Sequence, residues 1–156
     1  EKIDSFIKNG TEVVRPLQRE LRNIMWENCG VVRSEEKLKQ GLNRISSIKN
    51  LIKKLDVRPD SEGYEDLMLA FDLEASILSA EATILGAIHR KESRGAHQRR
   101  DYEENLEDFN LNFHIKLQED SKLKVHAVKL KPMSEHLKLV IKNTDQIIDF
   151  EGKLIE

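Results

Sequence analysis

The sequence predicts a mainly α protein: an antiparallel, spectrin-like three-helix bundle followed by a small β-hairpin and an extended C-terminal segment. Apolar residues recur every three or four positions through three stretches of residues 11–92, which is the period of an amphipathic helix. After Gly95 the period changes to two, which is typical of strands. We expect the bundle in residues 1–100, the loop and hairpin in 101–133, and an extension without a clear pattern in 134–156.

The first helix is expected to begin between residues 12 and 15. Pro16 suits that position, because a missing N–H costs least in the first turn of a helix. Asn28 and Gly30 stop the helix, and Gly30 is expected to adopt the left-handed conformation of a helix C-terminus. The residues that form its apolar stripe are Val13, Val14, Leu17, Leu21, Ile24, Met25 and Trp26.

The second helix is expected from Ser34 to about Asp56. Ser34 is a typical N-cap, and the carboxylates of Glu35 and Glu36 follow it at the positive end of the helix dipole. Its apolar stripe consists of Leu38, Leu42, Ile45, Ile48, Ile52 and Leu55. A turn is then expected at Pro59, Asp60, Ser61 and Gly63.

The third helix is the longest and is expected from Tyr64 to Glu92. It is apolar over more than half of its circumference, which is typical of a helix buried between partners. Two short helices are not expected to cover such a face alone. The sequence therefore predicts a further covering element, or self-association of the chain in its absence.

The hairpin is expected from two alternating segments, 111–117 and 123–130, with Glu119-Asp120-Ser121 at the turn. Leu137, Leu139 and Ile141 alternate in the same way and predict a third strand. The last fifteen residues fit either a strand or a fraying tail.

Composition excludes several classes of protein and of site. The 156 residues suffice for one domain, and a net charge of -2 provides no global field for nucleic acid. A single cysteine excludes a disulfide framework, and no Cys/His cluster has the spacing of a metal site. There is no run of 18 apolar residues and no signal peptide at residues 1–10, so no membrane insertion is expected. The absence of an initiator Met suggests a piece of a longer protein.

Residues 25–33, Met-Trp-Glu-Asn-Cys-Gly-Val-Val-Arg, are the first candidate functional segment. Trp26 is expected to be a core or interface aromatic, and Gly30 to end the helix. Arg33 is expected to be a surface cation near carbonyl ends. Cys29 has no nearby His or Asp to activate it, so we expect a small buried apolar residue.

Residues 89–101 are the second candidate segment, with five Lys or Arg against two acids. Three interpretations remain open: a phosphate or nucleic-acid loop, a solvated basic loop at a helix end, and a loop docked against a protein surface. The first is disfavoured because Tyr102 is the only interleaved aromatic and the chain is slightly acidic. In the third, Ser93, Arg94 and His97 satisfy polar groups and Gly95 permits a tight reversal. The histidines expected on the surface of strands are His114, His126 and His136.

Residues 90–102 read R-K-E-S-R-G-A-H-Q-R-R-D-Y and resemble the R-K-E-S-R-G-A-H-x-R-x-D-Y signature of the flavoprotein subunits of succinate dehydrogenase and fumarate reductase. Residues 25–33 resemble the M-W-E-x-x-G-I-V-R helix end of that family. The two motifs occur in the family's order, and the resemblance covers about residues 11–131. Residues 134–156 resemble nothing in it. The related L-aspartate oxidases typically read S-R-G-L-H, so Ala96 favours the succinate dehydrogenase or fumarate reductase branch.

The resemblance implies the C-terminal helical domain of an FAD-dependent oxidoreductase that interconverts succinate and fumarate. It implies as partners the protein's own flavin-binding domain and an iron–sulfur subunit, through which electrons pass to quinone. The complex would lie peripherally on the cytoplasmic side of a membrane. Nothing here resembles the Gly-rich dinucleotide motif, so no catalytic, cofactor-binding or metal-binding residue is assigned to this chain. The resemblance makes the following residues family-motif, interface or structure-fixing positions: Trp26, Gly30, Arg33, Ser93, Arg94, Gly95, Ala96, His97, Arg99 and Asp101.

Two alternatives stay open at this point. One is the C-terminal domain of an L-aspartate oxidase, whose soluble parent works without an iron–sulfur subunit. The other is a stand-alone helical interaction module whose basic loop binds an acidic partner or nucleic acid.

Overall fold

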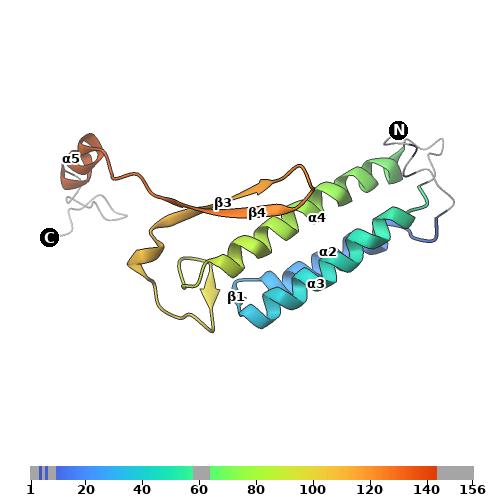
Figure 1. Cartoon of the computed structure of the whole chain (residues 1–156), viewed down its shortest axis with the longest axis horizontal. Coiled ribbons are helices and arrows are strands. Elements are labelled where there is room, and N and C mark those ends of the chain that lie inside the picture. Colours follow the sequence, from blue (N-terminus) through green and yellow to red (C-terminus); the bar gives the residue numbers. More distant parts are fainter. Residues whose placement is uncertain (1–3, 5, 7–9, 58–63, 144–156) are drawn as a thin grey trace, which may run out of the picture.

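The computed structural model describes residues 4, 6, 10–57 and 64–143 of the chain. Its three long helices lie side by side, and a hairpin runs along the last of them (Figure 1). The predicted fold class, a mainly α bundle with a small β-hairpin, is confirmed. The helices are α2 (Val14–Cys29), α3 (Glu35–Leu51), α4 (Glu65–His89) and α5 (Glu135–Asn143), with 3-10 turns at Ile52–Lys54 and Glu107–Phe109. The strands are β1 (Val32–Arg33), β2 (Gln98–Arg99), β3 (Leu111–Leu117) and β4 (Leu123–Lys129).

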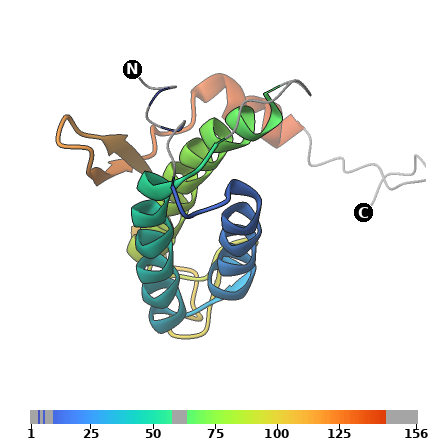
Figure 2. The same cartoon turned by 90° about the vertical axis from the view of Figure 1, so that its right-hand side faces the viewer.

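The bundle core is formed by the apolar stripes that the sequence shows on α2, α3 and α4. Burial of these aliphatic side chains supplies the main driving force for folding. Gly41 allows α3 to approach its neighbours, because a Cβ there would lie 2.8 Å from Cβ of Asn28 and 3.1 Å from Cδ1 of Ile84. An isolated bridge between Glu12 and Leu55 brings the end of α3 back to the start of α2 (Figure 2). The largest fully buried apolar side chains of the core are Val14, Ile24, Leu38, Ile45, Leu55, Val57, Leu73 and Ile84.

The helix ends agree with the sequence at Gly30 and Ser34, but two C-termini come earlier than predicted. Helix α3 ends at Leu51 and continues as a 3-10 turn, so the predicted end at about Asp56 is wrong. Helix α2 ends at Gly30 as expected, but Gly30 has φ -64 and ψ -158, so it is extended and not left-handed. Ser34 caps α3 as expected, since its side chain accepts a hydrogen bond from the Lys37 amide. Helix α4 ends at His89, three residues before the predicted end, because Arg90 leaves the helical conformation.

The hairpin supplies part of the cover that the sequence requires for α4. Strands β3 and β4 are antiparallel, with Leu111 opposite Lys129 and Leu117 opposite Leu123. Their half-buried apolar residues face α4, where a Cβ on Gly86 would lie 3.2 Å from Cδ1 of Ile115. On this flank of α4 the hairpin is therefore the covering element. The predicted turn at Glu119-Asp120-Ser121 is present, with Ser121 at φ 61.

The third predicted strand is wrong: Leu137, Leu139 and Ile141 lie in helix α5, and all three are exposed. The helix is favoured locally because the Ser134 hydroxyl accepts a hydrogen bond from the Leu137 amide. The same assignment corrects His136, which lies on this helix and not on a strand. The turn expected at residues 59–63 and nearly all of the last fifteen residues lie outside the described part of the chain. Among the described helices, none has the length and apolar character needed to cross a membrane.

Candidate functional site

The two candidate segments meet at one end of the bundle. Strands β1 and β2 form a short parallel pair that places Val32 beside Gln98 and Arg33 beside Arg99. The amide of Gln98 donates to the carbonyl of Val31 at 3.1 Å, and the amide of Arg100 donates to that of Arg33 at 2.9 Å. We call residues 30–35 together with 89–106 the helix-end junction, because it joins the C-termini of α2 and α4 to the N-terminus of α3.

Arg99 is the centre of the helix-end junction and is only 1% exposed. Its Nη1 donates to the carbonyl of Ala87 at 2.8 Å, where the C-terminus of α4 leaves an acceptor unpaired. Nε and Nη2 donate to the two carboxylate oxygens of Asp101, each at 2.7 Å. The guanidinium also lies 4.8 Å from the ring centroid of Tyr102. The planar guanidinium of Arg99 therefore contacts the end of α4, the Asp101 carboxylate and the Tyr102 ring at the same time.

Asp101 extends this arrangement to the next helix. Its Oδ2 accepts a hydrogen bond of 2.8 Å from the amide of Glu35, the first residue of α3. The bidentate hydrogen bonds from Arg99, together with this amide, hold the pKa of Asp101 well below its usual range. Arg99 and Asp101 thus connect the C-terminus of α4 to the N-terminus of α3, with charges that suit both helix dipoles.

Glu92 is fully buried and has three partners. Its carboxylate pairs with Arg90 and with Arg94, whose Nε lies at 2.9 Å, and accepts from the amide of Leu106 at 3.1 Å. Burial by itself would raise the pKa of Glu92, but the hydrogen bonds from Arg94, Leu106 and Arg90 outweigh it and lower the pKa. Arg90 also donates to the carbonyl of Leu111 at 2.7 Å, which fixes the start of the hairpin.

His97 connects the two motifs through its ring. Nδ1 lies 2.8 Å from Nη1 of Arg33 and Nε2 lies 3.0 Å from the carbonyl oxygen of Arg90. Arg33 has only donors, so Nδ1 accepts and the proton is on Nε2. Burial, and then the positive charges of Arg33 and Arg99, lower the pKa of His97, although the bond to the Arg90 carbonyl opposes them. His97 is therefore a neutral linker, and Arg33 also donates to the carbonyl of Gly30 at 2.6 Å.

The remaining motif residues shape the loop between Glu92 and Tyr102. Arg94 and His97 exchange backbone hydrogen bonds of 2.9 and 3.0 Å around Gly95 and Ala96. Gly95 has φ +56, a conformation that L side chains rarely adopt, so the tight reversal needs glycine. The Ser93 hydroxyl accepts from the Arg99 amide at 2.8 Å and donates to the carbonyl of Tyr102 at 2.8 Å.

Three of the five Lys and Arg side chains of residues 89–101 form ion pairs within the protein, although the net charge of the segment stays positive. Arg90 and Arg94 are paired with Glu92, and Arg99 with Asp101. Lys91 and Arg100 remain as exposed cations of this segment. Two exposed cations are a weak footprint for a phosphate backbone. Among the described residues there is no group of three His, Cys, Asp or Glu side chains that could hold a metal ion.

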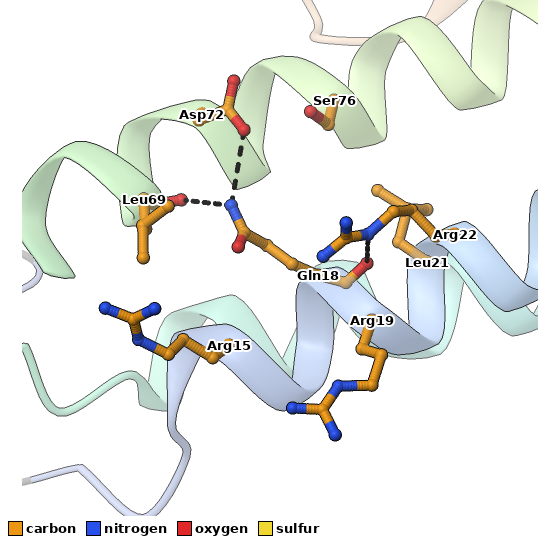
Figure 3. A pocket seen from close by; sticks show the side chains of 8 residues that line it. All are labelled: Arg15, Gln18, Arg19, Leu21, Arg22, Leu69, Asp72 and Ser76. Atoms are coloured by element: carbon orange, nitrogen blue, oxygen red, sulfur yellow. Dashed lines mark hydrogen bonds between the residues drawn. The ribbon is translucent and has the colours of Figure 1, made fainter. Parts of the chain in front are cut away.

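The first candidate segment, residues 25–33, differs from the second because its aromatic side chain is exposed. Trp26 is 84% exposed, so the prediction that it is a core aromatic is wrong. The alternative prediction, that Trp26 is an interface residue, stays a prediction. Cys29 is buried as expected, and burial raises the pKa of its thiol. Trp26 borders an open groove of about 780 Å³ between α2 and α4, which continues past Leu21 and Arg22 towards Arg15 (Figure 3).

Sequence reasoning missed Glu92 and Arg90 as members of the helix-end junction, and it missed the arginines along the groove. A signal for the groove was present, because Arg15, Arg19, Arg22 and Trp26 recur at intervals of four, three and four residues. The sequence does not indicate that Glu92 is buried, because a carboxylate close to two arginines is equally typical of an exposed, solvated ion pair.

Residues 18–144 match the family described as the fumarate reductase flavoprotein C-terminal region. This match extends beyond residue 131, where the sequence resemblance was expected to end. An uncharacterized FAD-dependent oxidoreductase of Methanocaldococcus jannaschii is 35% identical over 116 residues, covering 74% of this chain and 20% of that protein. The succinate dehydrogenase flavoprotein subunit of Coxiella burnetii is 33% identical over 125 residues, covering 80% of this chain and 21% of that protein. The chain thus spans about a fifth of the length of these curated relatives.

Solved structures share the fold. Mycobacterium smegmatis Sdh1 in complex with UQ1 has a TM-score of 0.79 at 20% identity, over 99% of this chain and 26% of that chain. Adenylylsulfate reductase of Archaeoglobus fulgidus has a TM-score of 0.70 at 23% identity, over 81% of this chain and 20% of that chain. Since both proteins carry the same fold, the fold alone does not select a substrate.

Proposed function

The chain belongs to the family of fumarate reductase flavoprotein C-terminal regions, and we propose that it is the C-terminal helical domain of a subunit that interconverts succinate and fumarate with FAD. In this proposal the domain scaffolds the flavin-binding part of the same polypeptide and contributes to docking an iron–sulfur subunit. The observation that carries the proposal is that the family match contains both sequence motifs, and that these motifs meet in the helix-end junction.

The chemistry of the parent would come from FAD, which accepts or donates the hydride exchanged with the dicarboxylate. The described residues of this chain do not fit that cofactor. A dinucleotide pyrophosphate requires a Gly-rich turn between a strand and a helix N-terminus. Helix α3 follows strand β1, but the residue between them is Ser34, and the first amide of α3 already donates to Asp101. We therefore assign the flavin to the part of the parent outside this chain.

In this proposal the helix-end junction has a structural role: it holds the helices and the hairpin in fixed positions. The clamp of Arg99 and Asp101 fixes α4 against α3, and Arg90 fixes the hairpin against α4. Such rigid elements hold a neighbouring domain in one orientation, which an enzyme needs if substrate and flavin are to be aligned within a fraction of an ångström. His97 is a positioning residue in this scheme and has no role in proton transfer.

The proposal of an assembly with an iron–sulfur subunit is supported by the fold that the chain shares with a quinol-fumarate reductase with menaquinol molecules. We place the parent peripherally at the cytoplasmic side of a membrane, bound through its partners. Self-association of the 156-residue chain alone stays a prediction.

The test is to express the complete parent polypeptide and to measure bound flavin and turnover. We expect stoichiometric FAD, and fumarate reduction with a reduced viologen dye or succinate oxidation with an artificial acceptor. The 156-residue chain, prepared in parallel, is expected to bind no flavin. A parent without flavin would overturn the proposal, and so would a flavoprotein that oxidises L-aspartate or reduces adenylylsulfate but leaves both dicarboxylates unchanged.

A further inference from the structure

We propose that the groove between α2 and α4 is the docking surface for an acidic amphipathic helix of the parent polypeptide outside this chain. We call this surface the Arg–Trp groove. This inference rests on the proposed function, because it assigns a place to the rest of the parent protein. The groove is lined on α2 by Arg15, Arg19, Arg22, Met25 and Trp26, and on α4 by Asp72, Ala75, Ser76, Ser79, Ala80 and Thr83.

The α2 side of the groove has the composition of a binding hot spot. Arg15, Arg19, Arg22 and Trp26 are all exposed, and their intervals of four, three and four residues place them along one side of the helix. Tryptophan and arginine are the residues most enriched among those that dominate binding energy at interfaces. An indole that is 84% exposed contributes little to the bundle core and is available for contact with a partner.

The charges along the groove call for an acidic partner. Arg15 is already paired with Glu65 at 2.8 Å. Arg19 makes no ion pair with any residue in the described ranges, and Arg22 donates only to the backbone carbonyl of Gln18 at 3.4 Å, within those same ranges. The carboxylate of Asp72 is bonded instead to the Gln18 amide, as Figure 3 shows. Two adjacent cations are therefore without a carboxylate partner among the described residues, and a partner with two acidic side chains one turn apart would complement them.

The floor of the groove suits a helix. Ala75, Ser79 and Thr83 are small exposed residues, each four positions apart on α4. Small side chains allow a third helix to approach to the usual interaxial distance of about 8–10 Å. Arg15 and Trp26 are eleven residues apart on α2, which corresponds to about 16 Å at 1.5 Å per residue. The occupant is thus about three helical turns long, with acidic residues near Arg19 and Arg22 and an apolar anchor against Met25 and Trp26.

The parent polypeptide is the source that the observations favour. About four-fifths of the length of the curated relatives lies outside the matched region, so under the proposed function this domain adjoins a large part of the same polypeptide. The hairpin covers the other flank of α4 and leaves the Arg–Trp groove open. A second copy of the chain fits less well, because a symmetric pairing of the two α2 stripes brings Arg19 and Arg22 towards like charges.

Trp26 is the single tryptophan of the chain, so its environment can be followed specifically. Hydroxyl-radical footprinting with mass spectrometry compares the oxidation rate of Trp26 in the 156-residue chain and in the complete parent. We expect the oxidation rate of Trp26 to be at least about tenfold lower in the parent, because hot-spot residues lie in fully desolvated pockets. Equal oxidation in both proteins, with FAD bound to the parent, would overturn the inference and leave the proposed function standing. A parent without FAD contradicts the proposed function, whatever the rate at Trp26.

A binding experiment identifies the chemistry of the occupant. The remainder of the parent, produced separately, is titrated against the 156-residue chain and its variants. W26A and the double variant R19E/R22E are each expected to weaken binding by at least about tenfold, because both remove central contacts. R100E is the matched control, since Arg100 is an exposed cation outside the lining of the groove, and it is expected to bind as the wild type does. Equal affinities for R19E/R22E and R100E would contradict an acidic occupant. Self-association of the chain that W26A abolishes would instead identify a second copy in the groove and overturn the inference.

Discussion

The helix-end junction and the Arg–Trp groove both contain arginines and an aromatic ring, yet they use them in opposite ways. In the junction, Arg99 is 1% exposed and finds its carboxylate, helix end and ring within the chain. In the groove, Arg19, Arg22 and Trp26 are exposed, and within the described residues neither arginine has an ion pair with a carboxylate.

The difference teaches how to interpret a basic motif. Residues 89–101 look like a binding loop in the sequence because acids are few there, but Glu92 pairs with both Arg90 and Arg94, and Asp101 pairs with Arg99, so three of the five cations are engaged within the chain. The arginines of α2 look unremarkable in the sequence because acids occur nearby, but Glu20 and Glu27 are engaged by Arg44 of α3. Charge pairing in space, and not local charge density, decides which surface is left to bind a partner.

The largest effect is expected from removing Arg99. R99M keeps an unbranched side chain but leaves Asp101 and the Ala87 carbonyl without their donor. Breaking such an arrangement should lower the free energy of unfolding by about 3 kcal/mol, measured by urea denaturation. R100M, which removes the adjacent exposed arginine, should change it by less than about 0.5 kcal/mol. Similar losses for both variants would contradict the assignment of Arg99 as the centre of the junction.

A smaller loss is expected from Glu92. E92Q preserves the shape of the side chain but removes the charge that Arg90 and Arg94 share, so the free energy of unfolding should fall by about 2 kcal/mol. E104Q, which changes an exposed carboxylate in the same loop, is the matched control. If E92Q proved as stable as E104Q in thermal and urea unfolding, the buried carboxylate would not hold the loop.

His97 makes the stability of the junction dependent on pH. Its pKa is lowered in the folded state, so the unfolded chain takes up a proton first as the pH falls below about 6.5. Unfolding should therefore become easier from pH 7.5 to pH 5.5. Urea titrations at several pH values should show a smaller dependence in H97Q than in the wild type. H114Q, which alters an exposed histidine of β3, should retain the dependence of the wild type.

The smallest effect on stability is expected in the groove. Because Trp26 is 84% exposed, W26A should change the free energy of unfolding by no more than about 0.5 kcal/mol. Differential scanning calorimetry of the 156-residue chain can check this expectation. A loss of more than about 1.5 kcal/mol would mean that the indole supports the bundle, and the contrast between groove and junction would disappear.

Local periodicity made much of the fold predictable. The stripes of α2, α3 and α4 and the alternation of β3 and β4 depend on which face of each element is apolar, and that is written in consecutive residues. The prediction of a third strand at Leu137, Leu139 and Ile141 was wrong because a short apolar pattern can fit the period of a strand or that of a helix. Here a capping serine favours the helix. The predicted end of α4 at Glu92 was wrong because the Glu92 carboxylate binds groups of the following loop. The most distant of these in sequence is the amide of Leu106, fourteen positions later.

The sequence by itself determined the helical class, the hairpin and the two motifs that place the chain in its family. Only the tertiary structure decided that these motifs form one junction, since Arg33 and His97 are 64 positions apart and meet only when α3 and α4 fold back on α2. It also decided that Trp26 faces outward while Arg99 faces inward. The physical reason is that burial and charge pairing are properties of neighbours in space, and long-range packing of the helices selects those neighbours.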